Sequence, residues 1–114
     1  MLKVQFYQTE NGVEPVRKWL KEELTEEDKK IIGEDVKTVQ EGFPMGMPLV
    51  RSLGSGLWEV RSNITGKRIA RILFFHHADK LILLHGFVKK TQKTPSGEIN
   101  TSLDRLKRLM NQLT

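Results

Sequence analysis

The sequence contains no cysteine, so neither a disulfide framework nor a zinc site built on thiolates is available to it. It also lacks any window of about 18 apolar residues that would span a membrane. Residues 1–6 alternate between apolar and polar like a strand and do not form the apolar run of a signal peptide. We therefore expect a cytoplasmic protein that is neither exported nor inserted into a membrane.

Several signatures of metabolic enzymes are missing as well. We find no glycine-rich phosphate loop, no nucleophile motif and no carboxylate pair of the expected form. His76, His77 and His85 suggest a metal site, since imidazole is a common zinc ligand. However, adjacent histidines at a hairpin tip point in different directions, only Asp79 is a nearby acid, and the basic surroundings would repel a cation. We predict no metal and no cofactor.

The chain has the size and composition of a protein that folds by itself. It contains 114 residues, of which 38% are hydrophobic and 29% are charged. Such a chain buries about two thirds of its unfolded surface without disulfides or a structural metal. We expect one domain over residues 1–114.

The net charge of +5 is unevenly distributed along the chain. Residues 1–50 hold seven Lys and Arg against ten Asp and Glu, whereas residues 51–93 hold nine against two. Such a concentration of positive charge indicates a polyanionic partner, with nucleic acid first. The alternative is a solvated basic surface that binds nothing.

Hydrophobic periodicity in the first half predicts one strand and two helices. The strand covers residues 2–7, and the first helix begins at Pro15. Thr25 is expected to cap the second helix, which stops at Gly42. Residues 42–56 are rich in glycine and proline and predict a surface loop.

The second half predicts three consecutive strands and a final helix. The strands cover residues 57–62, 68–75 and 81–89, and short turns join them as antiparallel hairpins. The helix is expected to be capped by Asn100 or Thr101. Its apolar seam consists of Leu103, Leu106, Met110 and Leu113. The fold class is α+β, in the order β-α-α-β-β-β-α, with a mostly antiparallel sheet.

Arg71 lies in a strand, residues 68–75, that is apolar on both faces. An unpaired buried charge costs several kcal/mol, so Arg71 should have a partner or a ligand. If the following turn centres near Ala78, Arg71 faces His85 across the two strands. Arg61, on the preceding strand, points either into a cleft or into solvent at the strand end.

The last strand runs directly into a group of lysines, Lys89, Lys90 and Lys93. Clustered cations disfavour one another's charge, which brings a lysine closer to the range useful for proton transfer. We expect these lysines to lie beside the sheet end that carries the arginines.

Three stretches resemble the RelE/HigB superfamily of bacterial toxins, and more narrowly its phage-derived RelE-like branch. They are WEVR at 58–61, GKRIARILF at 66–74 and LHGFVKKTQKTP at 84–95. The resemblance implies a toxin, paired with a helix-turn-helix antitoxin, that enters the ribosomal A site and cleaves mRNA. It implies attack of the ribose 2′-hydroxyl on the adjacent phosphate without a metal, and contact with DNA only through the antitoxin.

The resemblance also suggests roles for individual basic residues. By position, Arg71 matches a transition-state stabiliser, and Arg61 and Lys89 match further basic positions of the catalytic site. Lys90 and Lys93 match RNA-binding positions. Arg68, beside a hairpin turn, is assigned to phosphate binding.

One departure from the family pattern concerns proton transfer. Several RelE-type toxins use a tyrosine near the C-terminus, whereas the single tyrosine here is Tyr7. The candidate to replace this tyrosine is His85 or one of the lysines that follow the last strand. The alternative role for His85 is structural, as a hydrogen-bonded histidine of the sheet. A non-catalytic module that holds RNA or an acidic partner protein on its basic sheet is the alternative for the whole chain.

Overall fold

The computed structural model describes residues 1–89 and 93–113, which form three α-helices, five strands and a short 3-10 turn. In chain order these are β1 (Lys3–Phe6), α1 (Pro15–Glu23), α2 (Glu26–Gly42), β2 (Val50–Gly54), β3 (Leu57–Ile64), η1 (Thr65–Lys67), β4 (Arg68–His77), β5 (Lys80–Lys89) and α3 (Ser96–Leu113). The α+β class is confirmed. The predicted order is right except for β2, which lies where a loop was expected.

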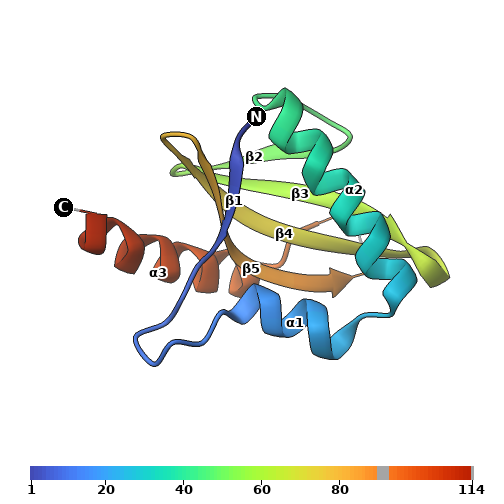
Figure 1. Cartoon of the computed structure of the whole chain (residues 1–114), viewed down its shortest axis with the longest axis horizontal. Coiled ribbons are helices and arrows are strands. Elements are labelled where there is room, and N and C mark those ends of the chain that lie inside the picture. The colour runs from blue at the N-terminus through green and yellow to red at the C-terminus, as the bar shows by residue number, and fades with distance from the viewer. Residues whose placement is uncertain (90–92, 114) are drawn as a thin grey trace.

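The strands form one sheet in the order β1-β5-β4-β3-β2. β1 is parallel to β5, and all other neighbours are antiparallel. Figure 1 shows α1 and α2 on the near side of the sheet and α3 passing behind it. No helix in the described part of the chain is long and apolar enough to cross a membrane.

The alternation predicted for the central strand is confirmed, because each face of β4 packs against different helices. Ala70, Ile72 and Phe74 belong to the core beneath α1 and α2, together with Trp19 and Ile32. The second core includes Leu57, Leu73, Leu84, Leu106 and Leu109, of which the last two come from α3. We call this second side of the sheet the α3 face.

The start of α2 follows from a capping box, as the sequence predicts. The Thr25 hydroxyl accepts a hydrogen bond from the Asp28 backbone N–H, and the Asp28 carboxylate accepts one from the Thr25 backbone N–H. The helix ends at Gly42 as expected. Thr25 and Asp28 thereby fix where α2 begins over the sheet.

Residues 50–54 form an edge strand rather than part of a loop. β2 pairs with β3 from Val50 opposite Val60 to Gly54 opposite Leu57, with an irregularity between Ser52 and Gly54. Only Val50 is buried in β2, so the strand carries almost none of the apolar alternation that marks a strand in sequence.

The C-terminal helix begins earlier than predicted, and its predicted cap is wrong. α3 starts at Ser96, and the Thr101 hydroxyl donates to the Gly97 carbonyl inside the helix. The apolar seam is also shifted in its second half. Leu106 and Leu109 are buried, whereas Met110 is 49% exposed and Leu113 is 47% exposed.

Candidate functional site

Arg71 and His85 lie on the same face of the sheet but are not direct partners. Arg71 pairs with Phe87, and His85 pairs with Leu73. The predicted register is wrong by two residues because His77 pairs with Lys80 around a two-residue turn, and an irregularity between Leu73 and Phe74 adds a further shift. Because a shift of two residues keeps every side chain on its face, both residues still lie on the α3 face.

Arg71 is completely buried in the middle of the sheet, at 0% exposure. Its Nη1 donates to the Lys93 carbonyl at 2.8 Å, and its guanidinium carbon lies 5.9 Å from the centre of the Phe87 ring. The expectation that Arg71 has a partner is therefore confirmed. Burial lowers the pKa of Arg71, Glu59 opposes this shift, and Arg61 and Arg51 add to it. The guanidinium nevertheless stays charged at neutral pH.

Glu59 is an acidic residue on β3 and, like Arg71, it is fully buried. Its Oε1 accepts a hydrogen bond from Arg61 Nε at 2.7 Å, and its Oε2 accepts one from the Thr94 hydroxyl. Both carboxylate oxygens are thus satisfied, which a buried charge requires. The Thr94 contact holds the chain just before α3 against β3.

Three arginines surround this one carboxylate. Arg51 on β2 pairs with Glu59, and Arg61 on β3 pairs with Arg71 on β4. The side chain of Arg61 is 10% exposed, and Arg51 is exposed. We call Arg51, Glu59, Arg61, Arg71 and Thr94 the Glu59 cluster. With three guanidinium groups against one carboxylate, this cluster carries a positive excess.

Two of the predicted lysines extend this positive surface. Lys89 is exposed and pairs with Ile69, which places it on the α3 face with Arg71. Lys93 is exposed and lies next to Thr94 in the chain. Lys90 lies outside the described residues. The expected proximity of Lys93 to the arginines is confirmed by the contact between its carbonyl and Arg71.

His85 is held by two neighbours from α3. Its Nδ1 lies 3.1 Å from Arg105 Nη1, and its Nε2 lies 3.3 Å from Glu98 Oε2. An arginine can only donate, so Nδ1 accepts and the proton is on Nε2, which donates to Glu98. Burial lowers the pKa of His85, Glu98 opposes the shift, and Arg105 reinforces it. The ring is therefore neutral at pH 7, and it stacks against Phe87 at 5.8 Å between centres.

Arg68 lies on the opposite face of the sheet, in phase with Ala70 and Ile72. Its Nη2 is 2.9 Å from Asp28 Oδ2, and its Nε donates to the Thr65 carbonyl. Asp28 also accepts hydrogen bonds from the Thr65 backbone N–H and hydroxyl. Arg68 thus joins the β3–β4 turn to the start of α2, and the structure does not bring it into the Glu59 cluster.

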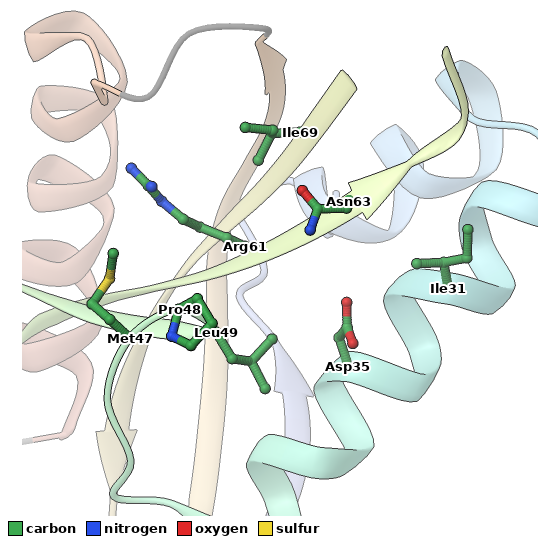
Figure 2. A pocket seen from close by; sticks show the side chains of 8 residues that line it. All are labelled: Ile31, Asp35, Met47, Pro48, Leu49, Arg61, Asn63 and Ile69. Atoms are coloured by element: carbon green, nitrogen blue, oxygen red, sulfur yellow. The ribbon is translucent and has the colours of Figure 1, made fainter. Parts of the chain in front are cut away.

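A pocket of about 470 Å³ opens next to the Glu59 cluster, at the point where β2 stops covering β3. Figure 2 shows its lining side chains, which come from α2, the segment before β2, β3 and β4. They are Ile31, Asp35, Met47, Pro48, Leu49, Arg61, Asn63 and Ile69. We call it the Asp35–Asn63 pocket, and no feature of the sequence pointed to it.

The remaining histidines do not converge. The His76 ring lies 5.1 Å from Phe43, which belongs to the core beneath α1 and α2, whereas His77 stacks on Phe75, which packs against the α3 face. Within residues 1–89 and 93–113, no three His, Asp or Glu side chains are grouped so that they could hold a metal ion.

With this geometry established, comparison with known families identifies one match. The family described as "Phage derived protein Gp49-like (DUF891)" matches residues 18–107. The chain belongs to this Gp49-like family. A search of curated proteins found no match to the chain.

The Gp49-like match covers most of α1, all of α2, the sheet from β2 to β5 and most of α3. It therefore includes the whole Glu59 cluster, His85 and Arg105, whereas β1 with Tyr7 lies before it. The Gp49-like family is a RelE/HigB-like toxin family, which is consistent with a toxin–antitoxin role at the general level.

Proposed function

We propose that this chain is the toxin of a toxin–antitoxin pair and that it cuts mRNA on the ribosome. The observation that carries the proposal is the Glu59 cluster, in which one buried carboxylate contacts Arg61 and lies near Arg51 and Arg71, on the face that also presents Lys89. An excess of guanidinium and ammonium groups is suited to binding phosphates and to stabilising the charge of a phosphorane.

The chemistry that these groups support is attack of a ribose 2′-oxygen on the adjacent phosphorus. The 2′-hydroxyl proton goes to a base, the bond from phosphorus to the 5′-oxygen breaks, and that oxygen receives a proton from an acid. The products are a 2′,3′-cyclic phosphate and a 5′-hydroxyl. Every step needs only bases, acids and cations, which a basic site can supply.

We assign these roles according to exposure. Lys89 and Lys93 are exposed, so they can contact the scissile phosphate and transfer protons. Arg61 is only slightly exposed at the edge of the cluster, and we assign it to stabilising the negative charge that develops on the phosphorane. Arg71 is 0% exposed, and we assign it to positioning, because it holds the Lys93 carbonyl rather than contacting solvent. His85 could transfer a proton only after its ring leaves Arg105 and Glu98, which hold both of its nitrogens in this structure.

A non-catalytic RNA-binding or protein-binding module is the second candidate, and a specific observation favours it. Arg71 is fully buried, and both ring nitrogens of His85 contact α3 side chains. Neither group is placed to reach a substrate in this conformation. The two candidates differ in outcome, because only the enzyme produces new RNA ends.

The test is induced expression in a bacterial host, with growth and the 5′ ends of mRNA followed after induction. Wild type should arrest growth and produce new mRNA ends inside translated regions. The double variant Lys89→Ala/Lys93→Ala should relieve both effects. Lys21→Ala/Lys37→Ala is the matched control, because it removes two exposed lysines from α1 and α2 and should arrest growth like wild type.

The outcomes separate the candidates. Growth arrest without new mRNA ends would favour the binding module, and normal growth with a folded wild-type protein would contradict the toxin proposal. Co-expression with the protein encoded beside the toxin gene tests the partner. We expect a helix-turn-helix antitoxin there, and we expect it to restore growth.

A further inference from the structure

The Asp35–Asn63 pocket combines apolar walls with two polar side chains that have no partner of their own. Within residues 1–89 and 93–113, neither the Asp35 carboxylate nor the Asn63 amide makes a hydrogen bond or an ion pair. Asp35 is half-buried, and Asn63 is exposed. Because neither side chain is engaged by another described residue, both can exchange water for hydrogen bonds to a ligand at this concave site.

Three apolar side chains give the pocket a surface against which a ring can pack. Ile31 of α2, Leu49 before β2 and Ile69 of β4 are all partly buried, and they supply its apolar surface. Figure 2 shows Asp35 projecting from α2 toward β3, on which Asn63 lies. Apolar side chains together with a carboxylate and an amide match the needs of a nucleobase, which is flat and carries hydrogen-bonding groups along its edge.

The position of the pocket suits the rest of a nucleotide. Arg61 lines the pocket and also belongs to the Glu59 cluster, where its Nε donates to Glu59. Ile69 pairs with Lys89 on the neighbouring strand. A base seated in the pocket would therefore have its sugar and phosphate next to the cations assigned above to phosphate binding.

We propose that the Asp35–Asn63 pocket binds one base of the RNA and selects a base that carries an amino group. This inference rests on the proposed function, since it adds base selection to the same site. A carboxylate only accepts hydrogen bonds, and adenine, cytosine and guanine each offer an exocyclic amino group to it. Uracil offers none, and its one Watson–Crick N–H lies between two carbonyl oxygens that repel a carboxylate.

The test is titration of the isotope-labelled full chain with AMP, CMP, GMP and UMP, with the Asn63 side-chain amide observed by NMR. We expect this amide signal to shift, and the three nucleotides with amino groups to bind at least about fivefold more tightly than UMP. Asp35→Asn should abolish that preference, and Asn63→Ala should weaken it. Glu34→Gln is the matched control, because it removes the same charge from an exposed neighbouring position on α2 and should keep the preference.

Equal affinity for all four nucleotides, or the same change in Asp35→Asn and Glu34→Gln, would overturn the inference and leave only charge attraction. Binding of a protein segment in the pocket without nucleotide binding would overturn it as well. Failure of the pocket is distinguishable from failure of the proposed function. Cleavage of mRNA without base preference would contradict base binding in the pocket but not the nuclease. Base preference without cleavage would contradict the nuclease but not base binding in the pocket.

Discussion

The two faces of the sheet each hold a fully buried carboxylate, and the difference lies in the number of cations around it. Asp28, on the side of α1 and α2, contacts Thr65 and one arginine, Arg68. Glu59, on the α3 face, contacts Thr94 and shares its surroundings with three arginines. One cation against one carboxylate makes a balanced structural contact, whereas three against one leave charge available for a polyanion.

Removal of the Asp28 carboxylate should produce the largest change in stability. Asp28→Ala deletes the acceptor for Arg68, Thr65 and Thr25 and leaves a partly buried guanidinium without its carboxylate. We expect a loss of about 3–5 kcal/mol in the free energy of unfolding, measured by urea denaturation. Asp79→Ala, which removes one partner of an exposed ion pair at 3.6 Å, should cost no more than about 0.5 kcal/mol. Similar losses in the two variants would contradict the role of Asp28.

The two threonines allow a matched test of the two carboxylates. Thr94→Val removes the donor to Glu59 Oε2 and should cost about 1–3 kcal/mol. Thr65→Val should cost less, because the Thr65 backbone N–H still donates to Asp28 Oδ1. Urea denaturation of both variants gives the comparison. A greater loss in Thr65→Val would mean that the Thr94 hydrogen bond does not hold the chain just before α3 against β3.

Acid titration should distinguish Asp28 by its protonation. Burial alone would raise the pKa of Asp28, but hydrogen bonds from Thr65 and Thr25 outweigh it and hold the pKa well below the usual range. The unfolded chain therefore binds a proton near pH 4 before the folded chain does, and stability falls as the pH drops below about 4. The difference in unfolding free energy between wild type and Asp28→Asn should shrink by about 1 kcal/mol from pH 7 to pH 3. A constant difference would contradict the lowered pKa.

The arginines on the two faces should differ in their effect on RNA binding. Arg51→Ala removes an exposed cation of the Glu59 cluster, and it should reduce the slope of log affinity against log salt by about 0.7 for single-stranded RNA. Arg68→Ala should destabilise the fold but leave the slope unchanged, since Arg68 is bound to Asp28. Fluorescence anisotropy at several salt concentrations measures both. Equal slopes in the two variants would contradict the claim that only the α3 face supplies cations for RNA.

Strand alternation was enough to predict much of this arrangement. It placed Arg71 on one face of β4 and Ala70 and Ile72 on the other, because side chains alternate along a regular strand. His85 lies on the Arg71 face as well, because the turn and the irregularity each shift the pairing by one residue. The exact pairing was not predictable, since it depends on a two-residue turn and an irregularity that have no clear sequence mark. The same limit hid β2, whose one buried residue gives no periodic signal.

The partners of the arginines were beyond sequence reasoning for a different reason. Arg68 and Arg71 look alike in the sequence, and only the packing of α2 against the β3–β4 turn gives Arg68 its carboxylate. Thr94 lies 35 residues from Glu59 in the chain, so no local pattern joins the two residues. Such contacts follow from tertiary packing, which local patterns do not encode.

The most direct test of the central claim is the chemistry of the RNA ends made on purified ribosomes that carry a defined mRNA. If the Glu59 cluster and its lysines promote attack by the 2′-hydroxyl, mass spectrometry should find a 2′,3′-cyclic phosphate and a 5′-hydroxyl at the cut. Lys89→Ala/Lys93→Ala should give little of either, and Lys21→Ala/Lys37→Ala should match wild type. Uncut mRNA, or a 3′-hydroxyl with a 5′-phosphate, would contradict the account.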